Sequence, residues 1–365
     1  MSPNPIKASG GCGPRPPGGF STSWPPPPPA PPAERTGTAL HPRLGCAMLF
    51  SVRLAGCTHA ERHKLKRGRY NMKGLLVMNT FGQSEGFLAL RHSLLTAAAQ
   101  KEIQLDLYTN SQLLFDVTTN TPLRPLAAYD FCLFWDKDTV LGKQLEYRGL
   151  RLFNPVDGIT AADNKLLTHM ALCRAGLPQP ATVQAPLTFA GLGYTRLDFV
   201  EQAEAYLGYP MVIKECRGSF GWQVYLAQDR EAAVQILVEH APSPMLLQAY
   251  VGGPEGEDVR IYVVGGRVIG AIRRYNPHDF RANVASGGIA EAYAPTPGEA
   301  QLAIQAAAAL GLDFAGVDLL PGPNGPLICE VNSNAQFHGL AAKTGVDVAG
   351  AIFSHIQQVI DRHTV

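Results

Sequence analysis

The most informative hydrophobic pattern lies near the C-terminal end, between Leu312 and Gly339. Two short apolar runs, AGVDLL and LICEVN, flank the turn sequence PGPNGP, a pattern typical of a β-hairpin. Each run carries an acid among apolar residues, Asp318 in the first and Glu330 in the second. Asn332 follows Glu330 by two residues, so both side chains leave the same face of a strand. We expect the hairpin to bring these three side chains together.

Two interpretations of these oxygen donors are open. Two carboxylates and an amide oxygen are hard ligands, which suit Mg²⁺ with nucleotide phosphates completing the shell. Alternatively, the acids are solvated strand ends. Because burying two like charges without a cation is costly, acids inside apolar runs favour the metal site.

Residues 73–155 alternate between strand-like and helix-like patterns, which predicts an α/β domain with a small parallel sheet. The expected boundaries of this first domain are residues 72–155. The expected strands are 74–79, 103–108, 130–135 and 152–154, and the expected helices are 87–100 and 137–147.

The pattern next predicts one helix, Ala161–Ala175, ended by Gly176 and Pro178. Asp163 suits its first turn, where an acid is favoured by the helix dipole. Lys165 lies in the same turn, where a cation is disfavoured. Such a lysine is either a solvated surface residue, which the local sequence favours, or a cation held for an anionic ligand.

A strand, a glycine-bearing loop and a second strand are predicted in MVIKECRGSFGWQVYLA, beginning at Met211. Lys214 interrupts the first apolar run, and Gly218 and Gly221 follow it. Glycines let backbone N–H groups approach phosphate oxygens, and a lysine supplies a point charge. A plain hairpin explains the pattern equally well, and the Walker motif is absent.

The remaining apolar runs predict mainly antiparallel strands and two helices. Arg260 alternates with apolar neighbours in a hairpin whose turn is Gly265-Gly266. The polar stretch 275–286 has the composition of a loop that covers a ligand. The expected strands are 246–251, 259–264 and 267–272, and the expected helices are 301–310 and 348–360.

Composition divides the chain of 365 residues into two unlike parts. Residues 1–71 hold ten Lys/Arg, two Asp/Glu and 13 of the 29 prolines, so their charge is +8 against −7 for the rest. This part lacks the apolar content of a core and is expected to be a disordered leader. A mis-assigned start upstream of Met72 is the preferred interpretation; a targeting peptide and a basic RNA-binding arm are the alternatives.

The composition also excludes several classes of protein. No apolar run approaches the ~20 residues that cross a bilayer. The seven cysteines have no zinc-site spacing, and those of the folded part lie in apolar runs, as reduced thiols of a cytoplasmic protein do. Neither a Ser/His/Asp nor a Cys/His constellation is evident.

In combination these segments resemble the ATP-grasp fold, and within it the RimK-type ligases, over about residues 73–360. The most specific blocks are EDVRIYVVGGRVIGAIRR, DFRANVASGG, GLDFAGVDLL and GPLICEVNSN, in the order of the family. The resemblance implies an α/β (α+β ATP-grasp) architecture with an ATP-grasp domain at 156–365. Its small lobe would span about 188–250 and its C-terminal lobe about 251–365.

The resemblance also implies roles for matching residues in binding ATP. Lys165 and Lys214 match the lysines that hold the nucleotide phosphates. The family's loop over the phosphates matches Gly218, Ser219 and Gly221. The adenine and ribose contacts match Gln248, Tyr250 and Asp258.

Further matches concern the transferred phosphoryl group and the metal. Arg260 and Arg281 match arginines that face that group and the substrate carboxylate. The residues implied to bind Mg²⁺ or Mn²⁺, one ion or two, are Asp318, Glu330 and Asn332.

The implied reaction is ATP-dependent ligation of a carboxylate to an amine through an acylphosphate, with glutamate as one candidate amine. Ser286, the ending NSNAQFHG and Glu257 depart from the glutamate-adding pattern. A peptide-tailoring ligase that uses another amine is therefore an alternative. A non-catalytic nucleotide-binding scaffold is disfavoured because no metal ligand is missing. We expect neither membrane nor nucleic acid as a partner, and the family allows a homo-oligomer.

Overall fold

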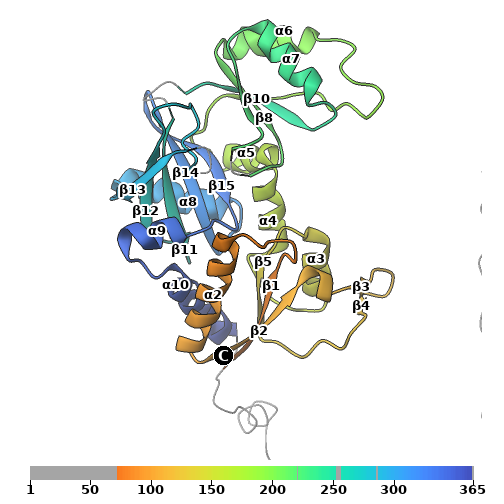
Figure 1. Ribbon diagram of the computed structural model, residues 1–365, viewed down its shortest axis with the longest axis vertical. Coiled ribbons are helices and arrows are strands. Elements are labelled where there is room, and N and C mark those ends of the chain that lie inside the picture. The colour runs from red at the N-terminus through yellow and green to blue at the C-terminus, as the bar shows by residue number, and fades with distance from the viewer. Residues whose placement is uncertain (1–71, 220, 252–255, 285–286, 364–365) are drawn as a thin grey trace, which may run out of the picture. The chain divides into compact units, whose positions relative to one another are not determined.

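The computed structural model describes residues 72–219, 221–251, 256–284 and 287–363 (Figure 1). The predicted leader and Ser286 lie outside these residues. Three principal β-sheets organise the described part of the chain. The α/β architecture expected from the sequence is confirmed.

The first sheet is parallel and has the strand order β2-β1-β5-β6. Both of its predicted helices are present, and each begins at a residue whose side chain caps it: Ser84 accepts from the Phe87 amide and Asp138 from the Leu141 amide. The elements are β1 (Met72–Met78), α2 (Glu85–Gln100), β2 (Ile103–Thr109), β5 (Phe131–Trp135), α3 (Thr139–Tyr147) and β6 (Leu152–Phe153). A short turn, η1 (Asn110–Gln112), and a two-stranded hairpin, β3 (Phe115–Asp116) with β4 (Thr121–Pro122), connect β2 to β5.

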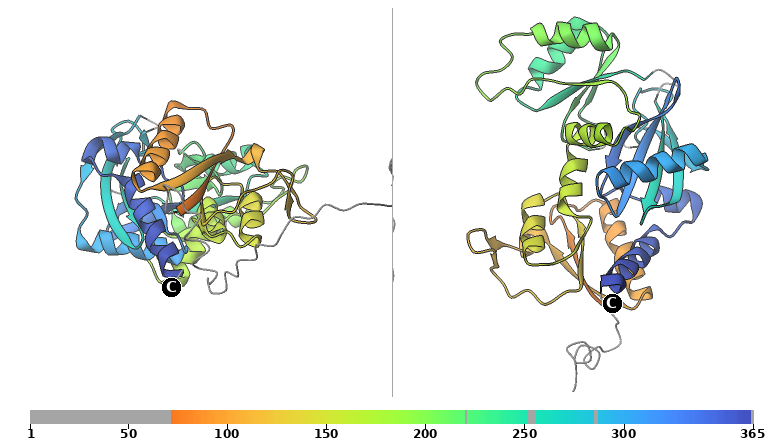
Figure 2. Two further views of the ribbon diagram at one scale, coloured as in Figure 1. Left: turned by 90° about the horizontal axis from the view of Figure 1, so that it is seen from below. Right: turned by 180° about the vertical axis from the view of Figure 1, so that it is seen from behind.

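The second sheet is antiparallel, with the order β7-β10-β8-β9. The predicted hairpin is its β8–β9 pair. Two helices pack on this sheet and were not predicted from the sequence (Figure 2). The elements are β7 (Thr182–Gln184), α6 (Asp198–Leu207), β8 (Met211–Glu215), β9 (Val224–Ala227), α7 (Arg230–Glu239) and β10 (Met245–Ala249).

The third sheet is antiparallel, with the order β13-β12-β11-β14-β15. It contains both predicted C-terminal hairpins, and helix α8 packs on one face. The elements are β11 (Glu257–Val264), β12 (Arg267–Tyr275), β13 (Ile289–Tyr293), α8 (Pro297–Ala309), β14 (Phe314–Gly322), β15 (Gly325–Asn332), α9 (His338–Thr344) and α10 (Val348–His363).

The single helix predicted over 161–175 is wrong. Two helices are present, α4 (Val156–Asp163) and α5 (Lys165–Arg174), and they meet at Asn164. The Asn164 side chain accepts from the amides of Leu166 and Leu167, so a new helix begins there. Asp163 therefore ends α4 instead of opening α5, and its carboxylate forms an ion pair with Lys137 at 2.7 Å.

One hydrophobic cluster joins the first sheet to the third. Leu76 and Trp135 of the first sheet belong to the same buried cluster as Tyr262, Phe314 and Ile352. Trp135 stacks on Phe314 with ring centroids 5.4 Å apart. The first and third sheets thus share a core, whereas the second sheet has a core of its own around Met211, Leu237 and Leu247.

Among the described residues, no helix is both long enough and apolar enough to cross a membrane.

Candidate active site

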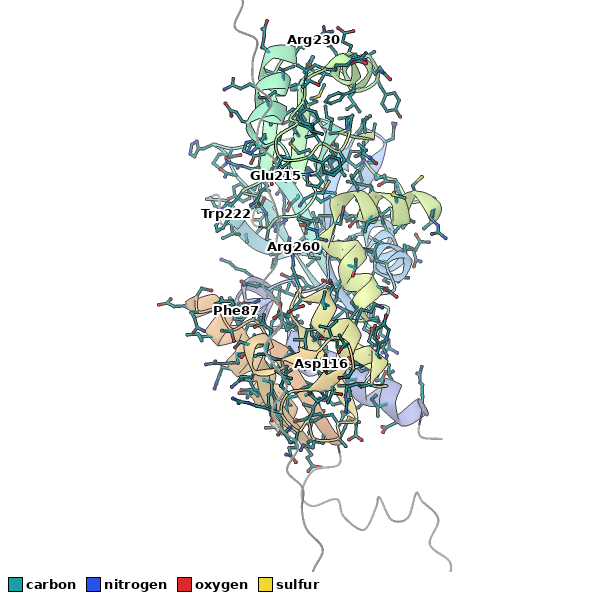
Figure 3. All side chains as sticks on the ribbon, turned by 90° about the vertical axis from the view of Figure 1, so that its right-hand side faces the viewer. Phe87, Asp116, Glu215, Trp222, Arg230 and Arg260 are labelled. Atoms are coloured by element: carbon teal, nitrogen blue, oxygen red, sulfur yellow. The ribbon has the colours of Figure 1, made fainter. Side chains whose placement is uncertain are left out.

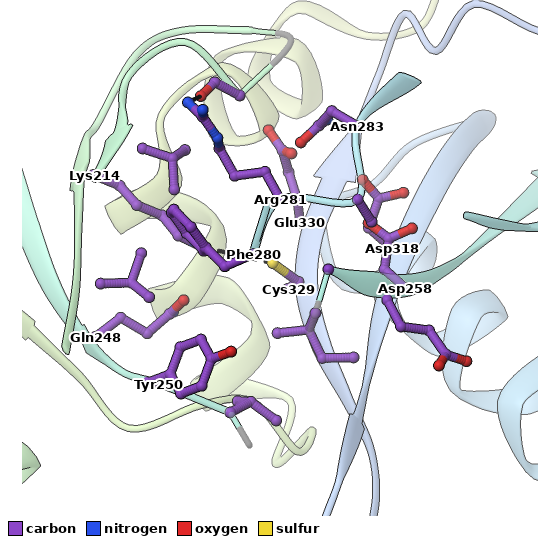
Figure 4. Close-up of a pocket in the computed structure, with 18 of the residues that line it drawn as sticks. Lys214, Gln248, Tyr250, Asp258, Phe280, Arg281, Asn283, Asp318, Cys329 and Glu330 are labelled. Carbon is purple, nitrogen blue, oxygen red and sulfur yellow. Dashed lines mark hydrogen bonds between the residues drawn. The ribbon is translucent and has the colours of Figure 1, made fainter. Parts of the chain in front are cut away.

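A pocket is lined by residues of the second and third sheets (Figure 4). Strands β8, β9 and β10 supply one wall, and β11, β12, β14 and β15 supply the other. Eleven residues predicted for the site, all except Arg260 and Asn332, line this pocket. They are Lys165, Lys214, Gly218, Ser219, Gly221, Gln248, Tyr250, Asp258, Arg281, Asp318 and Glu330.

The predicted acidic hairpin has the expected geometry. Asp318 of β14 lies opposite Glu330 of β15, and Gly316 lies opposite Asn332. The amide of Asn332 lies 3.5 Å from Asp318 Oδ2. The register shifts by one residue between Asp318 and Leu319, so Cys329 is the additional residue of a β-bulge.

Two arginines neutralise the two buried aspartates of the third sheet. Arg260 binds Asp318 through two hydrogen bonds of 2.6 Å, and Arg274 binds Asp258 through bonds of 2.7 and 2.6 Å. Arg274 also lies 3.1 Å from Asp318 Oδ2. Bidentate guanidinium–carboxylate pairs are among the strongest charge-assisted hydrogen bonds. The network therefore supplies the positive charge that two buried acids require.

The two acids respond differently to this environment. Burial tends to raise the pKa of Asp318, but the charges of Arg260 and Arg274 outweigh it, so the pKa lies below its usual value. Burial also raises the pKa of Asp258, and the negative charge of Asp318 adds to this shift despite Arg274. Asp318 is accordingly the acid that remains ionised most readily.

Lys214 is a buried cation at the wall of the pocket. Lys214 belongs to the apolar strand β8, and only 7% of the residue is exposed. Its Nζ lies 3.5 Å from Cys329 Sγ, and no carboxylate of the described residues forms an ion pair with it. A buried ammonium without an anion is costly, so this position favours an anionic ligand.

Lys165, the first residue of α5, approaches the same pocket. Its Nζ lies 3.9 Å from Glu330 Oε1 and 3.4 Å from the Gly218 carbonyl oxygen. Of the two interpretations of Lys165 left open by the sequence, the location beside the pocket fits the cation held for an anionic ligand. The Gly218 contact also connects α5 to the glycine-bearing loop.

Arg260 and Asn332 line a second, adjoining cavity of about 640 Å³. Trp135 at the end of β5 and Lys137, in the loop that follows this strand, also line the cavity. The first pocket and this cavity share Gly218, Ser219, Arg274, Asn283 and Glu330. The predicted site residues thus line two adjoining spaces that share part of their lining. Arg260, which lines the second space, is labelled in Figure 3.

The donors of the acidic hairpin fit a divalent cation in their chemistry. Asp318, Glu330 and Asn332 provide only oxygen ligands, as Mg²⁺ prefers. In the structure both carboxylate oxygens of Asp318 hold guanidinium groups. A metal ion at Asp318 would therefore replace some of these hydrogen bonds. Among the described residues, no cluster of three His, Cys, Asp or Glu side chains offers an alternative metal site.

Arg281 is held at the edge of the pocket. Asp279 accepts from its guanidinium at distances down to 2.7 Å, and the Gly221 carbonyl oxygen accepts at 3.1 Å. Arg281 thereby contacts the loop that was predicted to cover the phosphates. The part of this loop at residue 220 lies outside the described residues.

Arg274 was not predicted from the sequence, although it lines both spaces and contacts both buried acids. A signal was present in the segment AIRRY, because two adjacent arginines of a strand point to opposite faces, so one of them faces the buried side. His169 and Gln179 were not predicted either; they contact each other, and His169 contacts the predicted site residue Gln248. Nothing in the local sequence pattern identifies a contact between an α-helix and a distant strand.

Comparison with known protein families adds an independent observation. The model of the RimK-like ATP-grasp domain matches residues 162–356, more than half of the chain. The chain belongs to the RimK-like ATP-grasp family. The predicted resemblance is therefore confirmed. Curated relatives of the chain are named as ligases, so the predicted enzyme class is confirmed too: the chain is an ATP-dependent carbon–nitrogen ligase.

Two curated members of the family illustrate the similarity. A probable alpha-L-glutamate ligase of Serratia proteamaculans is 35% identical over 223 residues, which are 60% of this chain and 72% of that protein. The ribosomal protein bS6--L-glutamate ligase of Salmonella paratyphi B is 36% identical over 224 residues, 60% of this chain and 71% of that protein. The ATP-grasp RimK domain protein of Sphaerobacter thermophilus has a similar structure, with a TM-score of 0.60 at 23% identity over 78% of this chain and 98% of that one.

Proposed function

We propose that this RimK-like protein joins a carboxylate to an amine through an acylphosphate, attaching an amino acid such as glutamate to a peptide, a protein or a small-molecule carboxylate. The observation that carries the proposal is the buried Lys214, which lacks a carboxylate partner among the described residues and lines the same pocket as Asp318 and Glu330. A polyphosphate supplies the negative charge that this lysine requires.

In the first step an acceptor carboxylate oxygen attacks the γ-phosphorus of ATP. The bond to the leaving β-phosphate oxygen breaks, and acylphosphate and ADP form. Lys165 and Lys214 would hold the phosphate oxygens and offset their growing negative charge. Gly218, Ser219 and Gly221 would place backbone N–H groups near the same oxygens.

The acidic hairpin would hold the divalent ion. Asp318, Glu330 and Asn332 would hold Mg²⁺ or Mn²⁺, as one ion or two. Bound there, the ion would neutralise negative charge on the β- and γ-phosphate oxygens. Arg260 and Arg274, which now hold Asp318, would then be available to phosphate or substrate carboxylate oxygens.

In the second step the amine nitrogen attacks the acyl carbon. The carbon–oxygen bond to phosphate breaks, inorganic phosphate leaves, and the amine loses a proton as the amide forms. The second cavity of about 640 Å³ adjoins the pocket and has room for both organic substrates. Glu330 lines both spaces, so the acyl group would lie beside it at their junction.

Glutamate is the first amine to test because the name of the Salmonella relative includes L-glutamate as its substrate. Because Glu257 and the segment NSNAQFHG depart from the glutamate-adding pattern, other amino acids should be tested beside glutamate. The full chain would be incubated with ATP and Mg²⁺ and a panel of carboxylate and amine pairs, with release of phosphate as the measurement. The expected result is phosphate release that requires both substrates and is lost in Glu330→Gln.

The acylphosphate can be tested separately with an acceptor carboxylate labelled with ¹⁸O. Transfer of one labelled oxygen to inorganic phosphate is expected, because the attacking oxygen stays on phosphorus when the amide forms. Amide formation without any label in phosphate would contradict the acylphosphate route. ATP hydrolysis that no carboxylate and amine pair stimulates would contradict the proposed ligation.

A further inference from the structure

The side chain of Gln248 projects from β10 into the proposed nucleotide pocket (Figure 4). The residue is only 2% exposed. Its amide nitrogen lies 3.1 Å from His169 Nε2 and 2.9 Å from Thr182 Oγ1. Both partners, in α5 and β7, are outside the set of residues that line the pocket. The orientation of this one amide depends on which partner donates each hydrogen bond.

Two backbone carbonyl groups settle the direction of these hydrogen bonds, because a carbonyl oxygen can only accept. Gln179 Nε2 donates to the His169 carbonyl oxygen at 3.0 Å, so Gln179 Oε1 faces the ring. Gln179 Oε1 lies 2.6 Å from His169 Nδ1, which must therefore carry the proton. In the neutral ring Nε2 is then an acceptor, available to the Gln248 amide.

The second anchor is the carbonyl oxygen of Pro180. Thr182 Oγ1 donates to it at 2.9 Å, so the hydroxyl proton is committed and the oxygen accepts from Gln248. Burial lowers the pKa of His169 to about 4, and the charges of Lys214 and Lys165 contribute, so the ring is neutral near pH 7. Both protons of the Gln248 amide are thereby engaged away from the pocket.

We propose that Gln179, His169 and Thr182 form a relay that fixes Gln248 Oε1 as a hydrogen-bond acceptor toward the nucleotide base, which selects purines with a 6-amino group over those with a 6-oxo group. The 6-amino group donates to this oxygen, whereas a 6-oxo group presents a second acceptor against it. This inference rests on the proposed nucleotide site, with the base at Gln248 as the family resemblance implies. His169 and Gln179 are positioning residues, since they act through Gln248.

The selectivity follows from the cost of a buried polar group without a partner. A base with a 6-oxo group would leave Gln248 Oε1 facing another lone pair, which corresponds to roughly a 10- to 100-fold loss of affinity. If Gln248 could rotate by 180° about its last bond, its NH₂ group would accept the oxo base instead. The relay prevents that rotation because His169 Nε2 and Thr182 Oγ1 both lack a proton to offer.

The test compares the affinities of ADP and IDP for the full chain in Mg²⁺ by calorimetry, which requires no turnover. The wild-type chain is expected to prefer ADP by roughly 10-fold or more. Gln179→Leu removes the acceptor that holds the His169 proton on Nδ1, so the preference should fall to within about 3-fold, chiefly through weaker ADP binding. Gln235→Leu, on the exposed side of α7, is the matched control and should keep the wild-type ratio.

A rescue variant separates positioning from general damage to the fold. In Gln179→Leu/Gln248→Glu the carboxylate presents an acceptor in either rotamer, so the ADP preference should return. Nitrogen-15 NMR of His169 should show a protonated Nδ1 in the wild-type chain and loss of that tautomer in Gln179→Leu. If Gln179 has only a structural role, Gln179→Leu should leave the ratio of ADP to IDP affinity unchanged, and adding Gln248→Glu should restore nothing.

Each outcome bears on the inference. Equal affinities of the wild-type chain for ADP and IDP would overturn it, as would a Gln179→Leu variant that loses affinity for both nucleotides by the same factor. If Lys214→Met weakens the binding of both nucleotides while Gln179→Leu keeps the wild-type ratio of ADP to IDP affinity, the nucleotide site is supported and the relay is contradicted. If the wild-type chain binds neither nucleotide, the nucleotide site fails and the relay with it.

Discussion

Asp318 lies directly opposite Glu330 across strands β14 and β15, although the turn that joins these strands would place Cys329 there. Nearer the turn Leu319 pairs with Ile328 and Leu320 with Leu327. The bulge adds one residue, and a shift of one residue moves every later side chain to the other face. Glu330 therefore joins Asp318 on the face of the sheet that borders both cavities, and Cys329 occupies the bulge.

This relationship distinguishes two acids that are equivalent in the sequence. Asp318→Ala should abolish ligation and also lower the free energy of unfolding by about 3 kcal/mol or more, because Arg260 and Arg274 lose a buried partner. Glu330→Ala should abolish ligation with a change below about 1 kcal/mol, since its ion pair with Lys165 is long, at 3.9 Å. Urea unfolding together with ADP release measures both effects, and equal destabilisation by the two substitutions would contradict the assignment of the arginines to Asp318.

Lys214→Met should change nucleotide affinity and stability in opposite directions. Loss of the ammonium is expected to weaken ADP binding by roughly 10- to 100-fold, as for a hydrogen bond to a charged group. The nucleotide-free protein should become more stable by about 1 kcal/mol, because an apolar side chain replaces a buried cation that has no carboxylate partner among the described residues. Lys343→Met, at an exposed residue of α9, is the control. Calorimetry measures the affinity and thermal unfolding measures the stability.

The buried imidazole of His169 should make stability fall in mild acid. Burial holds the pKa of His169 at about 4 in the folded protein, below the ordinary value of 6.5. Between these two values the unfolded chain binds more protons, so the free energy of unfolding decreases as the pH falls, by up to about 3 kcal/mol. His169→Gln should show a shallower decrease in urea unfolding across this range, and parallel curves would contradict the assignment.

The rate at which Cys329 is alkylated should depend on whether the pocket is occupied. Burial raises the pKa of its thiol, so alkylation by iodoacetamide should be slow compared with that of the exposed Cys173. Saturating ADP should slow alkylation of Cys329 further, because the nucleotide would cover the pocket that this thiol lines. Cys173 should label at the same rate with and without ADP, and peptide mass spectrometry measures both rates. Labelling of Cys329 that ADP does not affect would place the nucleotide elsewhere.

Local patterns predicted most elements around the site. The apolar runs of β1, β5, β8, β11, β14 and β15 were recognised, as were the helices α2, α3, α8 and α10. Helices α6 and α7, which flank the β8–β9 hairpin, were not predicted, although their buried residues have helical spacing: Val200 with Ala203, and Ala233 with Leu237. The break at Asn164 was also missed, since apolar residues continue on both sides of it and only its cap separates α4 from α5.

The sequence by itself determined which side chains could serve the site: acids inside apolar strands, a lysine in a buried strand and glycines after it. Those features are local, because alternation and turn residues act over a few positions. The tertiary structure alone decided how they pair. A one-residue bulge brought Glu330 to Asp318, and a second register shift near Tyr262 set Asp258 against Arg274. The packing of α5 against α8 and β15 brought His169 within hydrogen-bond distance of Gln248 in β10. Register and packing depend on contacts between distant segments, which no local pattern encodes.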